Sequence, residues 1–129
     1  MHSMNPREDI IKNYIEGYNN FDVEKMVRDM DNELLFENIS NGMVTDSLSG
    51  KEDFMHQAEQ AKDFFSQRTQ TITAINHHDT FSEVFIDYEA IMAMDISDSL
   101  KFGDKIKLKG KSIFEFNSEG KISLIKDIS

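Results

Sequence analysis

The order in which the sequence pattern changes constrains the fold of this chain most strongly. Up to about residue 66, most apolar residues recur at helical spacing, and one short hairpin interrupts them. From residue 68 onward, apolar and polar residues alternate with a period of two, which is typical of strands with one buried face. Helices followed by long strands favour an α+β fold, in which helices cover one face of an antiparallel sheet.

Three helices are expected in the first half. Asn5, followed by proline, marks the start of the first, whose apolar stripe is Ile10, Ile11, Tyr14, Ile15 and Tyr18. Asp22 is expected to cap a short second helix, with Val23, Met26, Val27 and Met30 on its inner face. Ser49 and Glu52 resemble a capping box for a third helix that ends near Ser66, with Phe54, Ala58, Ala61 and Phe65 inside.

Six strands are expected, at residues 33–39, 43–48, 68–77, 82–94, 105–117 and 121–128. The first two are joined by Asn41-Gly42, a strong signal for a two-residue hairpin. If the connection between the fourth and fifth strands folds symmetrically near residue 100, Tyr88 faces Ser112 inside and Glu89 faces Lys111 outside. This register is expected because it pairs apolar with apolar positions and charge with charge.

Length and composition limit the class of protein. The 129 residues are expected to form a single domain, residues 1–129, with residues 1–5 disordered or left over from cloning. Without cysteine, disulfides and thiolate metal sites are excluded. Lacking a signal peptide or a run of about 20 apolar residues, the chain is expected to be cytoplasmic, with no membrane partner. Its net charge of −10 predicts no nucleic-acid partner.

No metal or cofactor is expected. His77 and His78 are adjacent, so in an extended strand they point to opposite faces and do not readily share one ion. His56 is expected on the polar side of the third helix. The sequence also contains no phosphate-binding loop and no nucleophile motif.

Four segments carry a resemblance to a known family: IIKNYIEGYNNFDVEKMVRDM, NELLFEN, LSGKEDF and KSIFEFNSEGKI. With the order of the elements, they make nearly the whole chain resemble the nuclear transport factor 2-like superfamily. Its SnoaL-like branch includes polyketide cyclases and ketosteroid isomerases. The resemblance implies a cystatin-like cone, in which a strongly curved antiparallel sheet wraps around the N-terminal helices and encloses an apolar pocket. It also implies that a homodimer is common.

The resemblance tests the isomerase chemistry residue by residue. Tyr14 matches the helix-one tyrosine that donates a hydrogen bond to the developing enolate. Asn38 stands where that branch has its aspartate base, and Ser112 stands in the place of its second acid, so steroid isomerase activity is expected to be absent or very weak. The cyclase branch has its acid and base on late strands, where alternation places Lys126 inward and Asp127 outward. No catalytic residue is therefore assigned.

Ten residues are expected to contact a ligand: Tyr14, Tyr18, Phe36, Asn38, Phe54, Tyr88, Met92, Leu108, Ser112 and Phe114. Three structural interpretations remain open beside this one. The helix tyrosines are equally explained as core aromatics. Asn38 is explained as an amide that stabilises the hairpin. Tyr88 and Ser112 are explained as partners that satisfy each other.

The predicted function is the binding of a small, largely apolar molecule in an internal pocket, with isomerase-like or cyclase-like proton transfer as its chemistry. Whether the protein is an enzyme stays open at this point. The alternative is a noncatalytic association or scaffold domain of the same fold. A lyase or hydrolase would need an inward carboxylate or histidine. A homodimer is expected through the outer sheet face, where Phe85, Ile91, Ile113 and Ile125 are predicted to lie.

Overall fold

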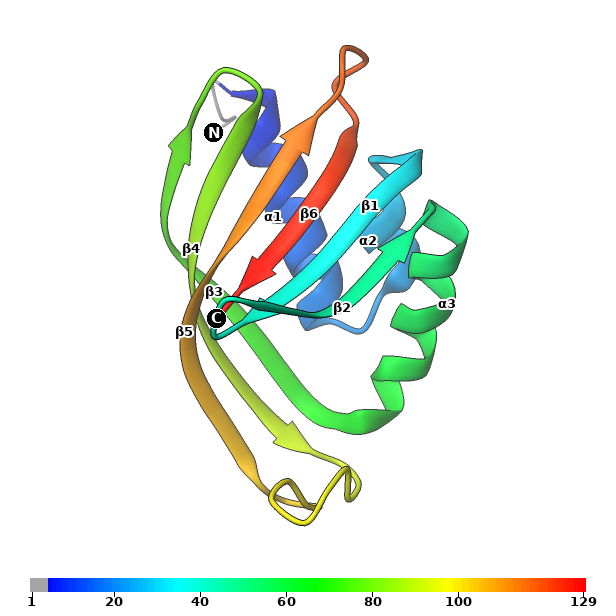
Figure 1. The fold of residues 1–129 in the computed structure, drawn as a ribbon, viewed down its shortest axis with the longest axis vertical. Coiled ribbons are helices and arrows are strands. Elements are labelled where there is room, and N and C mark those ends of the chain that lie inside the picture. The colour runs from blue at the N-terminus through cyan, green and yellow to red at the C-terminus, as the bar shows by residue number, and fades with distance from the viewer. Residues whose placement is uncertain (1–4) are drawn as a thin grey trace.

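The computed structural model describes residues 5–129, so the expectation for residues 1–4 lies outside the described residues. Figure 1 shows helices packed against a strongly curved sheet. The helices are α1 (Pro6–Asn19), α2 (Val23–Val27), α3 (Lys51–Ala61) and the short 3-10 helix η1 (Lys62–Phe64). The strands are β1 (Met30–Ser40), β2 (Met43–Ser49), β3 (Phe65–His77), β4 (Phe81–Met92), β5 (Lys105–Phe116) and β6 (Ile122–Ile128).

The six strands form one sheet in the order β2-β1-β6-β5-β4-β3. Neighbouring strands are antiparallel except β1 and β6, which run parallel. The expectation of a purely antiparallel sheet is therefore wrong for this pair. Helices α1 and α2 lie on one face, and α3 lies beside β1 and β2 (Figure 1). The predicted α+β architecture with a curved sheet around N-terminal helices is confirmed.

Local signals at the helix starts explain where the helices begin. The Asn5 side chain accepts a hydrogen bond from the Arg7 backbone N–H at 2.9 Å, and the Asp22 side chain accepts one from Lys25 at 3.1 Å. The capping box predicted at Ser49 is wrong, because Ser49 ends β2 and Gly50 is the N-cap of α3. Gly50 has φ of 100°, which favours glycine, and its N–H donates to the Leu34 carbonyl.

The register of β4 and β5 differs from the prediction by four residues. Tyr88 faces Leu108, and Ser112 faces Val84. The connection between the strands therefore folds about a point nearer residue 98 than residue 100. A register shift by an even number of residues leaves every side chain on the same face of the sheet, so the alternation of apolar and polar residues does not detect it. On the outer face of the sheet, Lys107 still lies opposite Glu89 and Lys109 opposite Asp87, and both pairs form ion pairs. Lys111 lies opposite Phe85 and forms a diagonal ion pair with Glu83.

Strand β6 contains the irregularity that matters most for the site. Ile122 pairs with Phe116, whereas Leu124 pairs with the preceding Glu115, so the register shifts between them. Beyond the shift Ile125 is buried, with 0% exposure, although alternation placed it outside. The predicted inward position of Lys126 is also wrong, since Lys126 forms an ion pair with Glu37. Because of this shift, the side chains at the end of β6 lie on the opposite faces of the sheet from those that simple alternation predicts.

The core lies between the concave face of the sheet and the three α-helices. Its buried residues include Ile11, Ile15, Val23, Met26, Val27, Leu34, Val84, Phe114, Ile122 and Ile125. Met30, predicted on the second helix, is buried at the start of β1 instead. Within residues 5–129, none of the helices has the length and apolar character that crossing a membrane requires.

Candidate functional site

Two cavities on the inner side of the sheet share Tyr18 and Asp127 as wall residues. The sheet cavity, of about 290 Å³, is lined by Tyr18, Asn38, Gln70, Ile86, Tyr88, Leu108, Gly110, Lys111, Ser112, Asp127, Ile128 and Ser129. The helix cavity, of about 110 Å³, is lined by Tyr14, Tyr18, Met26, Phe36, Leu48, Phe54, Gln57, Ala58, Ala61, Arg68 and Asp127. A third hollow, of about 310 Å³, lies along β3, β4 and β5 and contains none of the predicted site residues.

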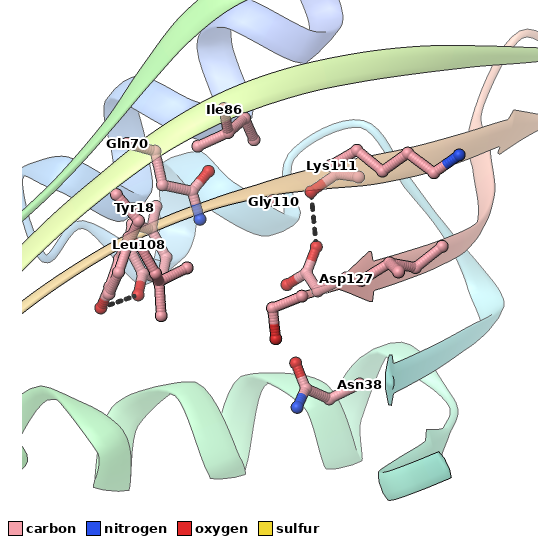
Figure 2. A pocket seen from close by; sticks show the side chains of 12 residues that line it. Tyr18, Asn38, Gln70, Ile86, Leu108, Gly110, Lys111 and Asp127 are labelled. Atoms are coloured by element: carbon pink, nitrogen blue, oxygen red, sulfur yellow. Dashed lines mark hydrogen bonds between the residues drawn. The ribbon is translucent and has the colours of Figure 1, made fainter. Parts of the chain in front are cut away.

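Asp127 is the acidic side chain common to both cavities. The Ser112 hydroxyl donates a hydrogen bond of 2.6 Å to its Oδ1 atom (Figure 2). Burial raises the pKa of Asp127 to about 6, and the hydrogen bond from Ser112 opposes that rise. The residue as a whole is only half-buried, but its carboxyl is desolvated enough to titrate near neutral pH. Such a carboxyl is able both to accept and to donate a proton.

Three tyrosines line the two cavities that Asp127 borders. The Tyr18 and Tyr88 hydroxyls are 2.8 Å apart and hydrogen-bonded, at the other end of the sheet cavity from Asp127 (Figure 2). Burial raises the pKa of both. Burial and the Asp127 charge also raise the pKa of Tyr14, whose hydroxyl has no hydrogen-bond partner among the residues described. All three therefore stay protonated at neutral pH and remain hydrogen-bond donors.

The structure distributes the ten predicted contacts over two cavities and the core. The sheet cavity takes Tyr18, Asn38, Tyr88, Leu108 and Ser112, and the helix cavity takes Tyr14, Phe36 and Phe54, with Tyr18 again. Met92 and Phe114 are almost wholly buried, at 2% and 0% exposure, and line neither cavity. The proposed Tyr88–Ser112 pair does not form, because the four-residue slip separates them and each bonds another partner.

Asn38 serves the hairpin. Its side-chain nitrogen donates to the Thr45 hydroxyl at 2.8 Å, and that hydroxyl donates to the Asn38 carbonyl oxygen at 3.2 Å. The residue thus bridges β1 and β2 while it borders the sheet cavity. This geometry matches the interpretation of Asn38 as an amide that stabilises the turn.

Sequence reasoning missed two charged residues of the site, Asp127 and Arg68. Simple alternation through β6 predicts an outward Asp127, but the register shift in β6 reverses its side of the sheet. Arg68, which opens the predicted third strand, is 3% exposed and lines the helix cavity. One signal for Arg68 was available, since it shares its period-two phase with Ile72, a residue packed against the core.

The histidines make local contacts. His77 Nδ1 and the Ser82 hydroxyl are 2.7 Å apart, and His78 Nε2 lies 2.8 Å from Glu83 Oε1. Hydrogen bonds from His78 and then Lys111 lower the pKa of Glu83. Over residues 5–129, no cluster of three or more His, Cys, Asp or Glu residues has an arrangement that would hold a metal ion.

The fold is found in many solved structures. A proposed polyketide cyclase from Xanthomonas campestris pv. campestris has a TM-score of 0.78 and 14% identity, covering 95% of this chain and 88% of its own. TerC, co-crystallized with polyporic acid, has a TM-score of 0.76 and 15% identity, covering 96% and 91%. An LEH-like epoxide hydrolase from M. tuberculosis has a TM-score of 0.73 and 13% identity, covering 93% and 79%.

Other similar structures are described as nuclear transport factor 2-like and cystatin-fold proteins. No protein-family model matches the sequence, and no curated protein matches it either. At identities below 20%, the structural likeness shows the fold. The predicted nuclear transport factor 2-like fold is thereby confirmed.

Proposed function

We propose that this chain, which has the nuclear transport factor 2-like fold, binds a small, largely apolar molecule in the sheet cavity and that Asp127 transfers a proton to or from it. The observation that carries the proposal is the position of Asp127. It borders both cavities and has a pKa of about 6. A carboxyl whose pKa lies near the working pH exists in both protonation states, as general acid–base chemistry requires.

The composition of the walls supports the proposed ligand class. Ile86 and Leu108 supply apolar surface, and Ser112, Tyr18 and Tyr88 supply hydroxyls. Binding sites for small molecules commonly have such apolar walls with a few convergent polar groups, and about 300 Å³ is the lower end of their usual volume. The sheet cavity therefore suits a molecule of one or two rings better than a steroid.

The proposed step is proton abstraction beside a carbonyl group. The Asp127 carboxylate takes the proton from carbon, and the electron pair moves to the carbonyl oxygen. A tyrosine hydroxyl donates a hydrogen bond to that oxygen as its negative charge develops. Return of the proton to a carbon completes an isomerisation or an exchange. Tyr18 and Tyr88 line the sheet cavity, and because one of their hydroxyls donates to the other, the second hydroxyl is free to donate to that oxygen.

Similar structures agree with small-molecule chemistry on this fold. They include the proposed polyketide cyclase, the epoxide hydrolase and the protein co-crystallized with polyporic acid. Because one fold supports many functions, this likeness is a weaker argument than the Asp127 geometry.

A second candidate is a noncatalytic association domain. The observation that favours it is the exposed apolar surface of the first hairpin, where Leu35, Met43 and Val44 are 47%, 71% and 54% exposed. Apolar patches of this kind often mark contacts between proteins. Under this function, no ligand would occupy the sheet cavity.

Proton exchange on a ketone tests the proposed chemistry. The protein is incubated with 1-indanone in deuterated buffer, and NMR follows the loss of the protons beside the carbonyl. We expect exchange that depends on the protein and that falls at least tenfold in Asp127→Asn. The exposed Asp98→Asn serves as the matched control and is expected to exchange at the unmodified rate.

The outcome separates the two functions. Exchange that persists in Asp127→Asn would place the proton acceptor elsewhere. If 1-indanone binds in the sheet cavity without exchanging, the protein is a binding domain. If native mass spectrometry of protein purified from its host and NMR with 1-indanone both show no ligand, the association domain replaces the proposed function.

A further inference from the structure

Arg68 is a buried cation in an aromatic setting. It lies in β3, has 3% exposure and packs against the turn between α1 and α2. Its guanidinium carbon is 3.8 Å from the centre of the Tyr18 ring and 4.6 Å from that of Phe21. These rings hold the guanidinium in place through cation–π contact, and they leave its nitrogens free to donate hydrogen bonds.

Most of the donor capacity of Arg68 is unused. Nε donates to the Tyr18 carbonyl oxygen at 2.8 Å, whereas the buried Nη2 has no partner among the described residues. Within that same range, no carboxylate forms an ion pair with Arg68; Asp127 lines the same cavity but is bonded to Ser112. An arginine stays charged in a protein, and buried charges are normally paired. Among the described residues, the Arg68 guanidinium is therefore in direct contact with no anion.

Backbone strain contributes to this arrangement. Phe21 has φ of 57°, a left-handed conformation that is unusual for a bulky aromatic residue. The neighbouring Asp22 N–H donates to the Gly17 carbonyl at 2.8 Å and fixes the turn. The strained turn thus places the Phe21 ring against the guanidinium. Strain of this kind is concentrated at ligand sites, where the surrounding structure maintains it.

We propose that Arg68 is a specificity-determining residue that binds a carboxylate group of the ligand. This inference rests on the proposed function and names its substrate class: a small apolar acid. The helix cavity, of about 110 Å³, has room for a carboxylate and little more. The apolar body of the ligand then extends past Tyr18 and Asp127, which border both cavities, into the sheet cavity.

The charge of the Arg68 guanidinium distinguishes a bound carboxylate from bound water molecules in the helix cavity. A cavity of about 110 Å³ has room for a few water molecules, which would satisfy the donors of Arg68. Water does not compensate the positive charge, however, whereas a carboxylate both accepts two parallel hydrogen bonds and neutralises the guanidinium. The preference for an anion over a neutral molecule of the same shape is therefore the property to measure.

The experiment compares 2-naphthoate with 2-naphthamide by isothermal titration calorimetry on the full chain at pH 8. The two probes have nearly the same shape and differ in charge. We expect 2-naphthoate to bind at least tenfold more tightly to the unmodified protein. In Arg68→Met this preference is expected to disappear through weaker binding of 2-naphthoate, while the affinity for 2-naphthamide is unchanged. The exposed Arg28→Met is the matched control and is expected to keep the preference.

Each possible result of this comparison supports or contradicts the carboxylate site or the proposed function. Equal affinity of the two probes for the unmodified protein overturns the carboxylate site and leaves the proposed function standing. Binding of neither probe contradicts both proposals. If Arg68→Met does not fold, the affinities of the two probes are compared between Arg68→Lys and the unmodified protein instead. The lysine variant keeps the charge but loses the planar fork, so it is expected to retain only part of the preference. A full preference in the lysine variant would overturn bidentate recognition.

Discussion

At the scale of single residues, burial gives Asp127 a different chemistry from the other aspartates. Desolvation raises its pKa from 3.8 to about 6, and the Ser112 hydroxyl limits the rise. At pH 7, a carboxyl with this pKa is protonated about a tenth of the time. A surface aspartate is protonated roughly a hundred times more rarely, so it cannot serve as a proton donor at that pH.

The stability of Asp127→Asn tests this raised pKa. Because the pKa of Asp127 is higher in the folded state than in the unfolded state, protonation of this carboxyl stabilises the folded state. This contribution to stability is complete below pH 3.8 and is lost as the pH rises through about 6. Asp127→Asn removes that loss, so it is expected to stabilise the protein at pH 8 by at most about 3 kcal/mol and to change little at pH 4. Urea unfolding at both pH values measures the difference. Equal effects at pH 4 and pH 8 would contradict the raised pKa.

Arg68→Met separates a ligand-binding arginine from a structural one. The substitution removes one hydrogen bond, worth about 1 kcal/mol, together with the stacking on Tyr18 and Phe21. It also removes an unpaired buried charge, whose desolvation costs several kcal/mol. We therefore expect the ligand-free variant to be at least as stable as the unmodified protein in urea. A loss of more than about 2 kcal/mol, with Arg28→Met unaffected, would indicate a structural role.

At the scale of elements, the β5–β6 pair positions the site. Gly110 lies in β5 beside the end of β6, and a Cβ atom there would be 2.7 Å from the Ile128 carbonyl oxygen. Since the obstacle is backbone, the strands must move apart to admit it. Ser112 and Asp127 lie on the same two strands and are joined by their hydrogen bond.

Gly110→Ala is accordingly expected to destabilise the protein by about 1–3 kcal/mol, as overpacking does elsewhere. The nearby exposed Lys109→Ala loses only a surface ion pair with Asp87 and is expected to cost less than about 1 kcal/mol. Urea unfolding of both variants gives the comparison. Equal stability of the two variants would show that β6 yields easily at this point.

The elements also show where prediction from sequence succeeds and fails. Caps at Asn5 and Asp22 and the Asn41-Gly42 hairpin depend on local chemistry, and all three were predicted correctly. The register of β4 and β5 depends on a twelve-residue connection whose geometry alternation does not report. The bulge in β6 depends on packing against neighbouring strands, so the orientation of Asp127 could not be predicted from the sequence.

At the scale of the whole molecule, the helix-then-strand order predicted the α+β class, and the family resemblance implied the curved sheet around the helices. Neither predicted the parallel pairing of β1 and β6. The candidate site was predicted less well, because it depends on which residues from distant segments meet. Tyr14 and Ser112 were found through the family resemblance. Arg68 and Asp127 were recognised from the structure, in which Arg68 is buried and both residues line the cavities.

The homodimer through the outer sheet face stays a prediction. Its proposed patch is smaller than expected, because Ile125 is buried in the core, whereas Phe85, Ile91 and Ile113 are half-buried. Sedimentation at micromolar concentration is expected to show a dimer that Ile113→Asp dissociates. Ile96→Asp, at an exposed isoleucine outside the sheet, is the control. A monomeric unmodified protein would contradict the dimer, and a dimer unaffected by Ile113→Asp would place the interface elsewhere.

The central claim is that Asp127 is a carboxyl able to exchange a proton near neutral pH inside a ligand cavity. NMR titration of aspartate carboxyl carbons, with Asp127→Asn to assign the signal, measures this directly. We predict a midpoint near pH 6 that shifts when 2-naphthoate is added. A midpoint at or below about pH 4, unchanged by the probe, would mean that Asp127 behaves as an ordinary surface acid and would contradict the account.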